Sequence, residues 1–219
     1  MNDQNLSPLS AANIYWLTPN LIGYLRIFLV ISSFCICFTH PYLFTGLYAT
    51  SQILDGVDGH VARRLNKTTT YGAMLDMVLD RASTTALLII LAHFYPTYIR
   101  FIIIMILIDM VSHFLYVYSS LLRGQKSHKT ISSHQNYLLK LYYGNSKIVL
   151  IMLCVGSEAC LLWFYLQYFD VFINENPVLQ LLKCIILSTL IFLFSLKQII
   201  NIIQLREAIK AIIALDVKL

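Results

Sequence analysis

The sequence predicts an all-α membrane protein with six transmembrane helices and a short interfacial helix near its N-terminal end. Hydrophobic residues make up 58% of the 219 residues and charged residues only 12%, and the mean hydropathy is +0.69. This composition is too apolar for a soluble domain with an ordinary polar surface. The apolar residues also gather in stretches long enough to cross a hydrocarbon core of about 30 Å. We therefore expect one membrane domain, residues 14–205, between a polar tail, 1–13, and a cytosolic C-terminal tail, 206–219.

Aromatic residues and a proline place the N-terminal elements. Residues 14–20 suit a short helix in the membrane interface, with its Tyr and Trp side chains at the level of the headgroups. Pro19 is expected to separate this helix from the first span, residues 21–38. Arg26 lies near the start of that span, where two interpretations are open: its side chain snorkels to the interface, or it binds a ligand.

The other spans are separated by short polar connections. They are expected at residues 42–64, 70–95, 98–118, 148–168 and 178–203. The longest connection, 119–147, holds five basic residues and no acidic residue, whereas 169–177 holds two acidic residues and no base. Because cytosolic loops are enriched in Lys and Arg, both termini and the connection 119–147 are expected in the cytosol.

A polar motif lies across the second and third spans. It reads Asp-x2-Asp-Gly-x2-Ala-Arg-x8-Gly-x3-Asp-x3-Asp, from Asp55 to Asp80. Asp55 and Asp58 are three residues apart and share one face of a helix; Asp76 and Asp80 are four apart and share a face of the next helix. The connection between these helices is short, so we expect antiparallel neighbours whose acidic faces converge.

Such a cluster indicates a metal site. Carboxylates gathered in apolar surroundings repel one another and are costly to desolvate. A divalent cation removes both costs, and oxygen ligands suit a hard ion such as Mg²⁺ or Mn²⁺. Arg63 adds a guanidinium whose geometry matches phosphate, while Gly59 and Gly72 leave room for a ligand or for close helix packing.

The same spacing resembles the signature of the CDP-alcohol phosphatidyltransferases. Its eight defining positions are filled here by Asp55, Asp58, Gly59, Ala62, Arg63, Gly72, Asp76 and Asp80. The resemblance implies metal-dependent transfer of a phosphatidyl group from CDP-diacylglycerol to an alcohol, with release of CMP and with two bound ions. It implies metal ligation by Asp55, Asp58, Asp76 and Asp80, and a general base at Asp80. It further implies binding of CDP-diacylglycerol by Gly59, Arg63 and Thr69.

Weaker segments narrow the resemblance to the phosphatidylinositol synthases of eukaryotes. These are Asp109-Met-Val-Ser-His113, Ser127-His-Lys129 and Gly156-Ser-Glu158. They imply myo-inositol as the acceptor, the endoplasmic reticulum membrane as the location and, by analogy, a homodimer. Asp109, His113 and Glu158 are polar residues within apolar spans and therefore candidates for the acceptor pocket, although contacts that only fix packing would also explain them.

Other acceptors and another class of protein remain open. A family member that uses glycerol phosphate, serine or inositol phosphate would carry the same core motif. An inositol phosphate acceptor calls for several cations, however, and the later spans offer chiefly Lys183 and Lys197, which favours free inositol. A membrane cation transporter would explain the intramembrane acids but not the spacing of Arg63 and Gly72. The net charge of +5 is spread between the spans, so no nucleic-acid partner is expected.

Overall fold

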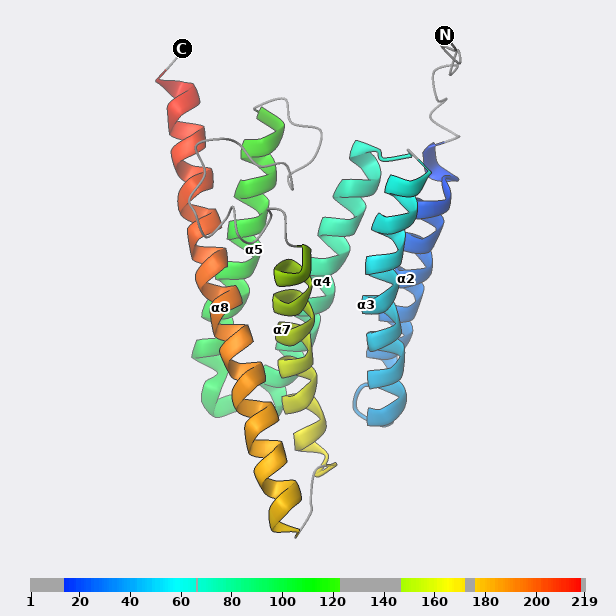
Figure 1. The fold of residues 1–219 in the computed structure, drawn as a ribbon, viewed down its shortest axis with the longest axis vertical. Coiled ribbons are helices and arrows are strands. Elements are labelled where there is room, and N and C mark those ends of the chain that lie inside the picture. Colours follow the sequence, from blue (N-terminus) through cyan, green and yellow to red (C-terminus); the bar gives the residue numbers. More distant parts are fainter. Residues whose placement is uncertain (1–13, 66, 123–146, 172–175, 218–219) are drawn as a thin grey trace. The chain divides into compact units, whose positions relative to one another are not determined.

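The computed structural model describes residues 14–65, 67–122, 147–171 and 176–217. These residues are mostly helical and contain no strand, which confirms the all-α class. The helices are α2 (Thr18–Cys35), α3 (Pro41–Arg64), α4 (Thr70–Phe94), the 3-10 turn η1 (Pro96–Tyr98), α5 (Ile99–Leu122), α7 (Lys147–Tyr168) and α8 (Pro177–Asp216) (Figure 1). Most of the basic connection, including the segment Ser127-His-Lys129, lies outside the described residues.

Four segments of the described chain are long and apolar enough to cross a membrane. They are α2, residues 96–122 with α5, residues 149–168 of α7, and α8. The other two helices, α3 and α4, carry the charged residues of the motif and have 24 and 25 residues. At about 1.5 Å per residue, each has the length of a span. The four apolar segments support a membrane protein, whereas the count of six spans stays a prediction.

The predicted start of the first span was wrong in one respect. The chain is helical at Ile14 and Tyr15, and the break before α2 falls at Trp16 and Leu17. Pro19 therefore does not separate the two helices but lies in the first turn of α2. A proline is well placed there, because the first N–H groups of a helix have no partner within the helix and the ring already has a helical φ.

The last helix is longer than the sequence predicts. The apolar pattern ends near residue 203, but α8 continues to Asp216 and so includes most of the expected C-terminal tail. Its 40 residues span roughly 60 Å, about twice the thickness of a hydrocarbon core. Pro177 starts the helix, and the Asn176 side chain caps it by accepting a hydrogen bond from the Val178 amide at 2.9 Å. Part of α8 must therefore lie outside the membrane core if the helix runs across it.

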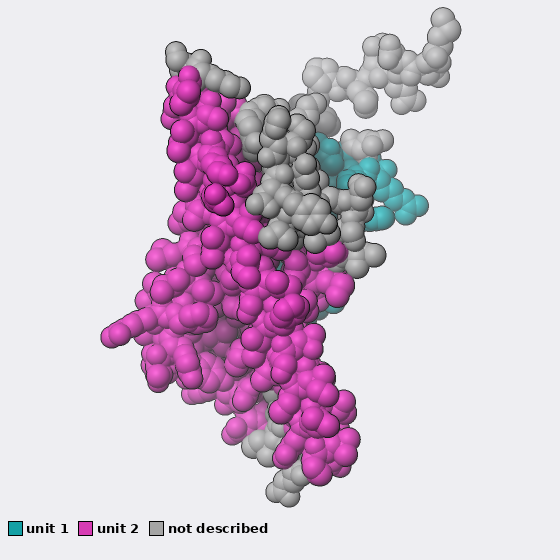
Figure 2. All heavy atoms as spheres, turned by 60° about the vertical axis from the view of Figure 1, so that its left-hand side comes forward, with its two compact units in different colours: residues 1–80 teal, residues 81–219 magenta. Residues whose placement is uncertain are grey.

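The chain divides into two compact units, residues 1–80 and 81–219 (Figure 2). In the first unit, α2 and α3 lie side by side and are joined by a short turn (Figure 1). The rings of Phe34, Phe44 and Tyr48 hold them together, with centroids 5.6 to 6.0 Å apart. Gly23 of α2 faces Leu75 of α4, where an added Cβ would lie 3.0 Å from the leucine side chain. This packing brings α2 against the start of α4.

In the second unit, α8 packs along both α5 and α7. Gly156 permits the contact between α7 and α8, because a Cβ at that position would lie only 2.5 Å from the Leu193 side chain. The end of α4 is held against the end of α7 by aromatic rings, with Phe94 stacked on Tyr168 at 3.8 Å. The Tyr95 hydroxyl also donates a hydrogen bond to the Phe164 carbonyl at 2.9 Å.

Candidate metal centre and active site

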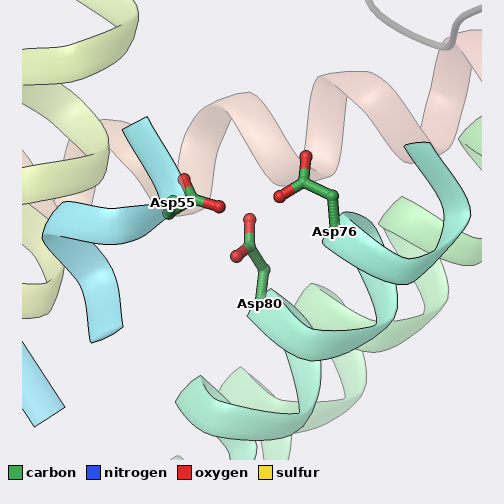
Figure 3. Close-up of side chains that lie close together, drawn as sticks. All are labelled: Asp55, Asp76 and Asp80. Atoms are coloured by element: carbon green, nitrogen blue, oxygen red, sulfur yellow. The ribbon is translucent and has the colours of Figure 1, made fainter. Parts of the chain in front are cut away.

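The four motif carboxylates come from two helices and converge as predicted. Figure 3 shows Asp55 on α3 and both Asp76 and Asp80 on α4, with their carboxylates directed toward one another. One oxygen from each of these three residues lies within 4.8 Å of the others. Asp58, one turn after Asp55, joins them through a shared contact with Arg26. Helical spacing alone thus places Asp55 with Asp58 and Asp76 with Asp80. The fold then brings the two pairs together.

Arg26 of α2 lies among these carboxylates. Its Nη1 atom is 2.7 Å from Asp55, 3.0 Å from Asp58 and 3.1 Å from Asp76. Its Nη2 atom is 2.7 Å from Asp80. The side chain is 1% exposed, which argues against the first of the two open interpretations, snorkelling to the interface. A guanidinium that pairs with four carboxylates gains more there than it would by reaching the interface.

The hydrogen-bonding capacity of Arg26 does not match the cluster. Nη1 carries two N–H groups, which it donates to Asp58 and Asp76, while Asp55 lies closer still, at 2.7 Å. Among the described residues, the buried Oδ1 atom of Asp55 therefore has no hydrogen-bond donor, and Nε of Arg26 has no acceptor. Buried polar atoms of this kind are rare in folded proteins and indicate that something further binds there.

The donor set fits a divalent cation. One guanidinium can offset only one of the four carboxylate charges, so the cluster can carry up to three negative charges in excess of Arg26. Carboxylate oxygens are the ligands that Mg²⁺ and Mn²⁺ prefer, and Asp55 offers an oxygen without a donor. Asp55, Asp58, Asp76 and Asp80 would hold such an ion.

The residues expected to bind the donor lie at the ends of the same helices. Arg63 is exposed near the end of α3, and its guanidinium lies over Gly59, where an added Cβ would be 3.3 Å from Nη1. Because Gly59 has no side chain, the guanidinium of Arg63, one helical turn further along α3, has space to lie over it. Thr69 precedes α4 and accepts a hydrogen bond from the Gly72 amide at 3.0 Å. This contact is a helix cap.

Gly72 has a packing role that the motif alone did not specify. A Cβ at residue 72 would lie 2.8 Å from Oδ1 of Asn20. Asn20 is 2% exposed and donates a hydrogen bond to the Ile14 carbonyl at 2.6 Å. Because residue 72 has no side chain, α4 can approach the first turn of α2 at this point, which lies one helical turn before Asp76 on α4.

Two of the three acceptor-pocket candidates belong to a polar network in the second unit. Both oxygens of Asp109 accept hydrogen bonds from Arg81, at 2.7 and 2.8 Å, and one also accepts from Asn201 at 3.0 Å. Lys197 donates to Asn201 at 3.0 Å. The His113 ring nitrogen Nδ1 is 2.8 Å from the Asp109 carbonyl and 3.7 Å from its carboxylate. The network joins α4, α5 and α8 inside an apolar unit.

The third candidate, Glu158 of α7, is held differently. Its carboxylate accepts a hydrogen bond of 2.6 Å from the Thr84 hydroxyl. Asn201 was not among the residues singled out from the sequence. The spacing of Lys197, Asn201 and Gln204, all buried on α8, places them on one face of the helix and could have indicated a polar stripe.

Comparisons with known proteins agree with the motif. Residues 16–174 match the family model described as CDP-alcohol phosphatidyltransferase. The CDP-diacylglycerol–inositol 3-phosphatidyltransferase of Schizosaccharomyces pombe is 38% identical, over 94% of this chain and 92% of its own length. The protein of that name from Candida albicans is 40% identical over 91% and 83%, and the human one 39% over 93% and 94%. No solved structure matches the chain significantly. The motif, the convergence of its carboxylates and these relatives show that the chain belongs to the CDP-alcohol phosphatidyltransferase family.

Proposed function

We propose that this protein synthesises phosphatidylinositol, by transferring the phosphatidyl group of CDP-diacylglycerol to myo-inositol and releasing CMP. The observation that carries the chemistry is the convergence of all four motif carboxylates on one buried point. The choice of substrates is supported by relatives named for this reaction, which align with more than nine tenths of the chain. A cation transporter, the alternative from another class, has no such support.

The donor carries a charged diphosphate, and the site offers groups that suit it. Two ions, Mg²⁺ or Mn²⁺, held by Asp55, Asp58, Asp76 and Asp80, would neutralise the charge of the diphosphate. Arg63 can clamp a phosphate with its exposed guanidinium, next to the space above Gly59. Thr69, the third residue expected to bind the donor, already caps α4 with its hydroxyl.

Asp80 is the proposed general base. Its carboxylate would take the proton of the acceptor hydroxyl as the oxygen attacks the phosphatidyl phosphorus. The bond from that phosphorus to the bridging oxygen breaks, and CMP leaves with the electron pair. Asp80 contacts Nη2 of Arg26, whereas Asp55, Asp58 and Asp76 all surround Nη1. With 25% of its side chain exposed, Asp80 is also open to an approaching hydroxyl.

The acceptor is proposed to be a neutral polyol bound near Asp109, His113 and Glu158. A polyol needs fixed hydrogen-bonding groups, which a network of buried polar side chains provides. A phosphorylated acceptor needs cations. In the described second unit, the partly buried Arg81 and the buried Lys197 are engaged with Asp109 and Asn201. This arrangement favours free inositol over inositol phosphate.

The setting of the reaction is also a proposal. The resemblance supports the endoplasmic reticulum membrane and a homodimer, and the basic connections support an active site on the cytosolic side. The donor is a lipid with a polar headgroup, so its reactive phosphorus lies at the boundary between membrane and water.

Purified protein in mixed micelles tests the proposed reaction. CDP-diacylglycerol would be offered with myo-inositol, inositol phosphate, serine or glycerol phosphate, each with Mg²⁺, Mn²⁺ or EDTA, and CMP release measured. We expect release with myo-inositol and a divalent ion, and none in EDTA. Preferential use of another acceptor would refute the inositol assignment and leave the family chemistry intact.

A further inference from the structure

Arg26 is a cation fixed inside the carboxylate cluster, and the motif does not include it. We propose that Arg26 is the resident counter-ion of the cluster and competes with the divalent cation for the carboxylates. This inference rests on the proposed metal site. It adds a residue from α2, outside the motif, whose charge sets how tightly the ion binds and how stable the protein is without it.

The first support is the set of partners. All four motif carboxylates lie within 3.1 Å of a nitrogen of Arg26. The Arg26 side chain is 1% exposed, so the carboxylates, and not water molecules, surround its charge. The backbone near Arg26 is also anchored, since its carbonyl accepts a hydrogen bond from Ser51 of α3 at 3.3 Å. The guanidinium is thus built into the packing between α2 and α3.

The second support is the imperfect match between donor and acceptors. Three carboxylates surround Nη1, which has two N–H groups, and the Asp55 oxygen at 2.7 Å receives no hydrogen bond. A spherical ion has no such directional limit and binds its oxygen ligands at about 2.0–2.2 Å. The same oxygens therefore suit an ion better than a guanidinium, and the two cations repel each other at this range.

Two opposite consequences follow. Without a bound ion, Arg26 offsets the repulsion among the clustered carboxylates, so its removal destabilises the protein. With an ion bound, the positive charge of Arg26 weakens the hold of the carboxylates on that ion, so its removal tightens binding. A residue that merely oriented the metal ligands would have the reverse effect on affinity, because removal of such partners typically weakens metal binding about 10–100-fold.

The test compares wild type with Arg26→Met, which keeps the length and apolar stem of the side chain but not its charge. Both proteins would be stripped with EDTA in detergent micelles and titrated with Mn²⁺, with free Mn²⁺ followed by electron paramagnetic resonance. Thermal unfolding would be recorded in EDTA and in Mn²⁺. We expect the variant to bind Mn²⁺ at least about tenfold more tightly and to gain more thermal stability from Mn²⁺ than wild type does.

A matched control is Arg81→Met, which removes the partly buried guanidinium that pairs with Asp109. It should lower the melting temperature equally with and without Mn²⁺ and leave Mn²⁺ affinity unchanged. Equal or weaker Mn²⁺ binding by a folded Arg26→Met protein would overturn the inference. Wild type that binds no Mn²⁺ would instead refute the metal site itself. If Arg26→Met does not fold even in Mn²⁺, Arg26→Gln decides, because it also lacks the charge but keeps a hydrogen-bond donor. Equal or weaker Mn²⁺ binding by that variant would overturn the inference, and tighter binding would support it.

Discussion

Asp109→Asn separates a binding role of the polar network in the second unit from a packing role. The wild-type carboxylate accepts two hydrogen bonds from Arg81 and one from Asn201. The amide keeps one acceptor oxygen and removes the negative charge that faces Arg81, whose side chain is 15% exposed. Removal of one partner of a buried ion pair costs about 3–5 kcal/mol, and the remaining acceptor places our expectation at about 3 kcal/mol. For a chain of this length, that loss lowers the melting temperature by roughly 6–12 °C.

A double variant makes the assay decisive. In Arg81→Met/Asp109→Leu both charges are replaced by apolar side chains, so most of the stability should return. If Asp109 binds inositol, KM for inositol rises roughly 10–100-fold in both variants, because each has lost a hydrogen bond to a charged group. KM for CDP-diacylglycerol should change little. Melting temperature and both KM values would be measured on the same preparations.

A stable double variant with a normal KM for inositol would refute the binding role and leave Asp109 as a packing residue. An equal rise of both KM values in a folded variant would lead to the same conclusion.

Three further outcomes are expected. Asp80→Asn should lower kcat by about 10²–10⁴ and change the binding of CDP-diacylglycerol little, because a base acts in the chemical step. Turnover and donor binding would be measured on folded protein, and near-normal turnover would remove Asp80 from the role of base. Gly72→Ala should cost about 1–3 kcal/mol in a thermal melt, because the new Cβ would meet Asn20 at 2.8 Å; an unchanged melting temperature would contradict this packing. Asn66, in a glycosylation sequon between α3 and α4, should stay unmodified in microsomes if that connection is cytosolic, and a glycan there would reverse the topology.

Several boundaries of the fold follow closely from the sequence. The second and third spans were expected at residues 42–64 and 70–95, and α3 and α4 occupy 41–64 and 70–94. Prolines and a short polar connection mark these ends, and such marks act locally on the backbone. The end of α8 was missed because Arg206 and Lys210 end the apolar pattern without ending the helix, since both residues are good helix formers.

The partners of the charged residues, by contrast, could not be read from the sequence. Arg81 follows Asp80 directly in the sequence, yet it pairs with Asp109, 28 residues away. Consecutive side chains on a helix point about 100° apart, so the two neighbours cannot share a face. The hydropathy around Arg26 was equally consistent with an arginine that reaches the interface, whereas its side chain is 1% exposed in the fold.

The sequence by itself determined the helical class, the membrane character and the pairing of carboxylates on helix faces, because hydropathy and helical periodicity are properties of adjacent residues. It also determined the chemistry of the cluster, since the residue types and their spacing are read directly. Only the tertiary structure decided that Arg26 of α2 enters the cluster, with partners 29 to 54 residues away along the chain. It alone also decided that Asn201 of α8 joins Asp109. Such contacts depend on how helices pack, and a buried charge can find its partner on any helix that packing brings within about 4 Å.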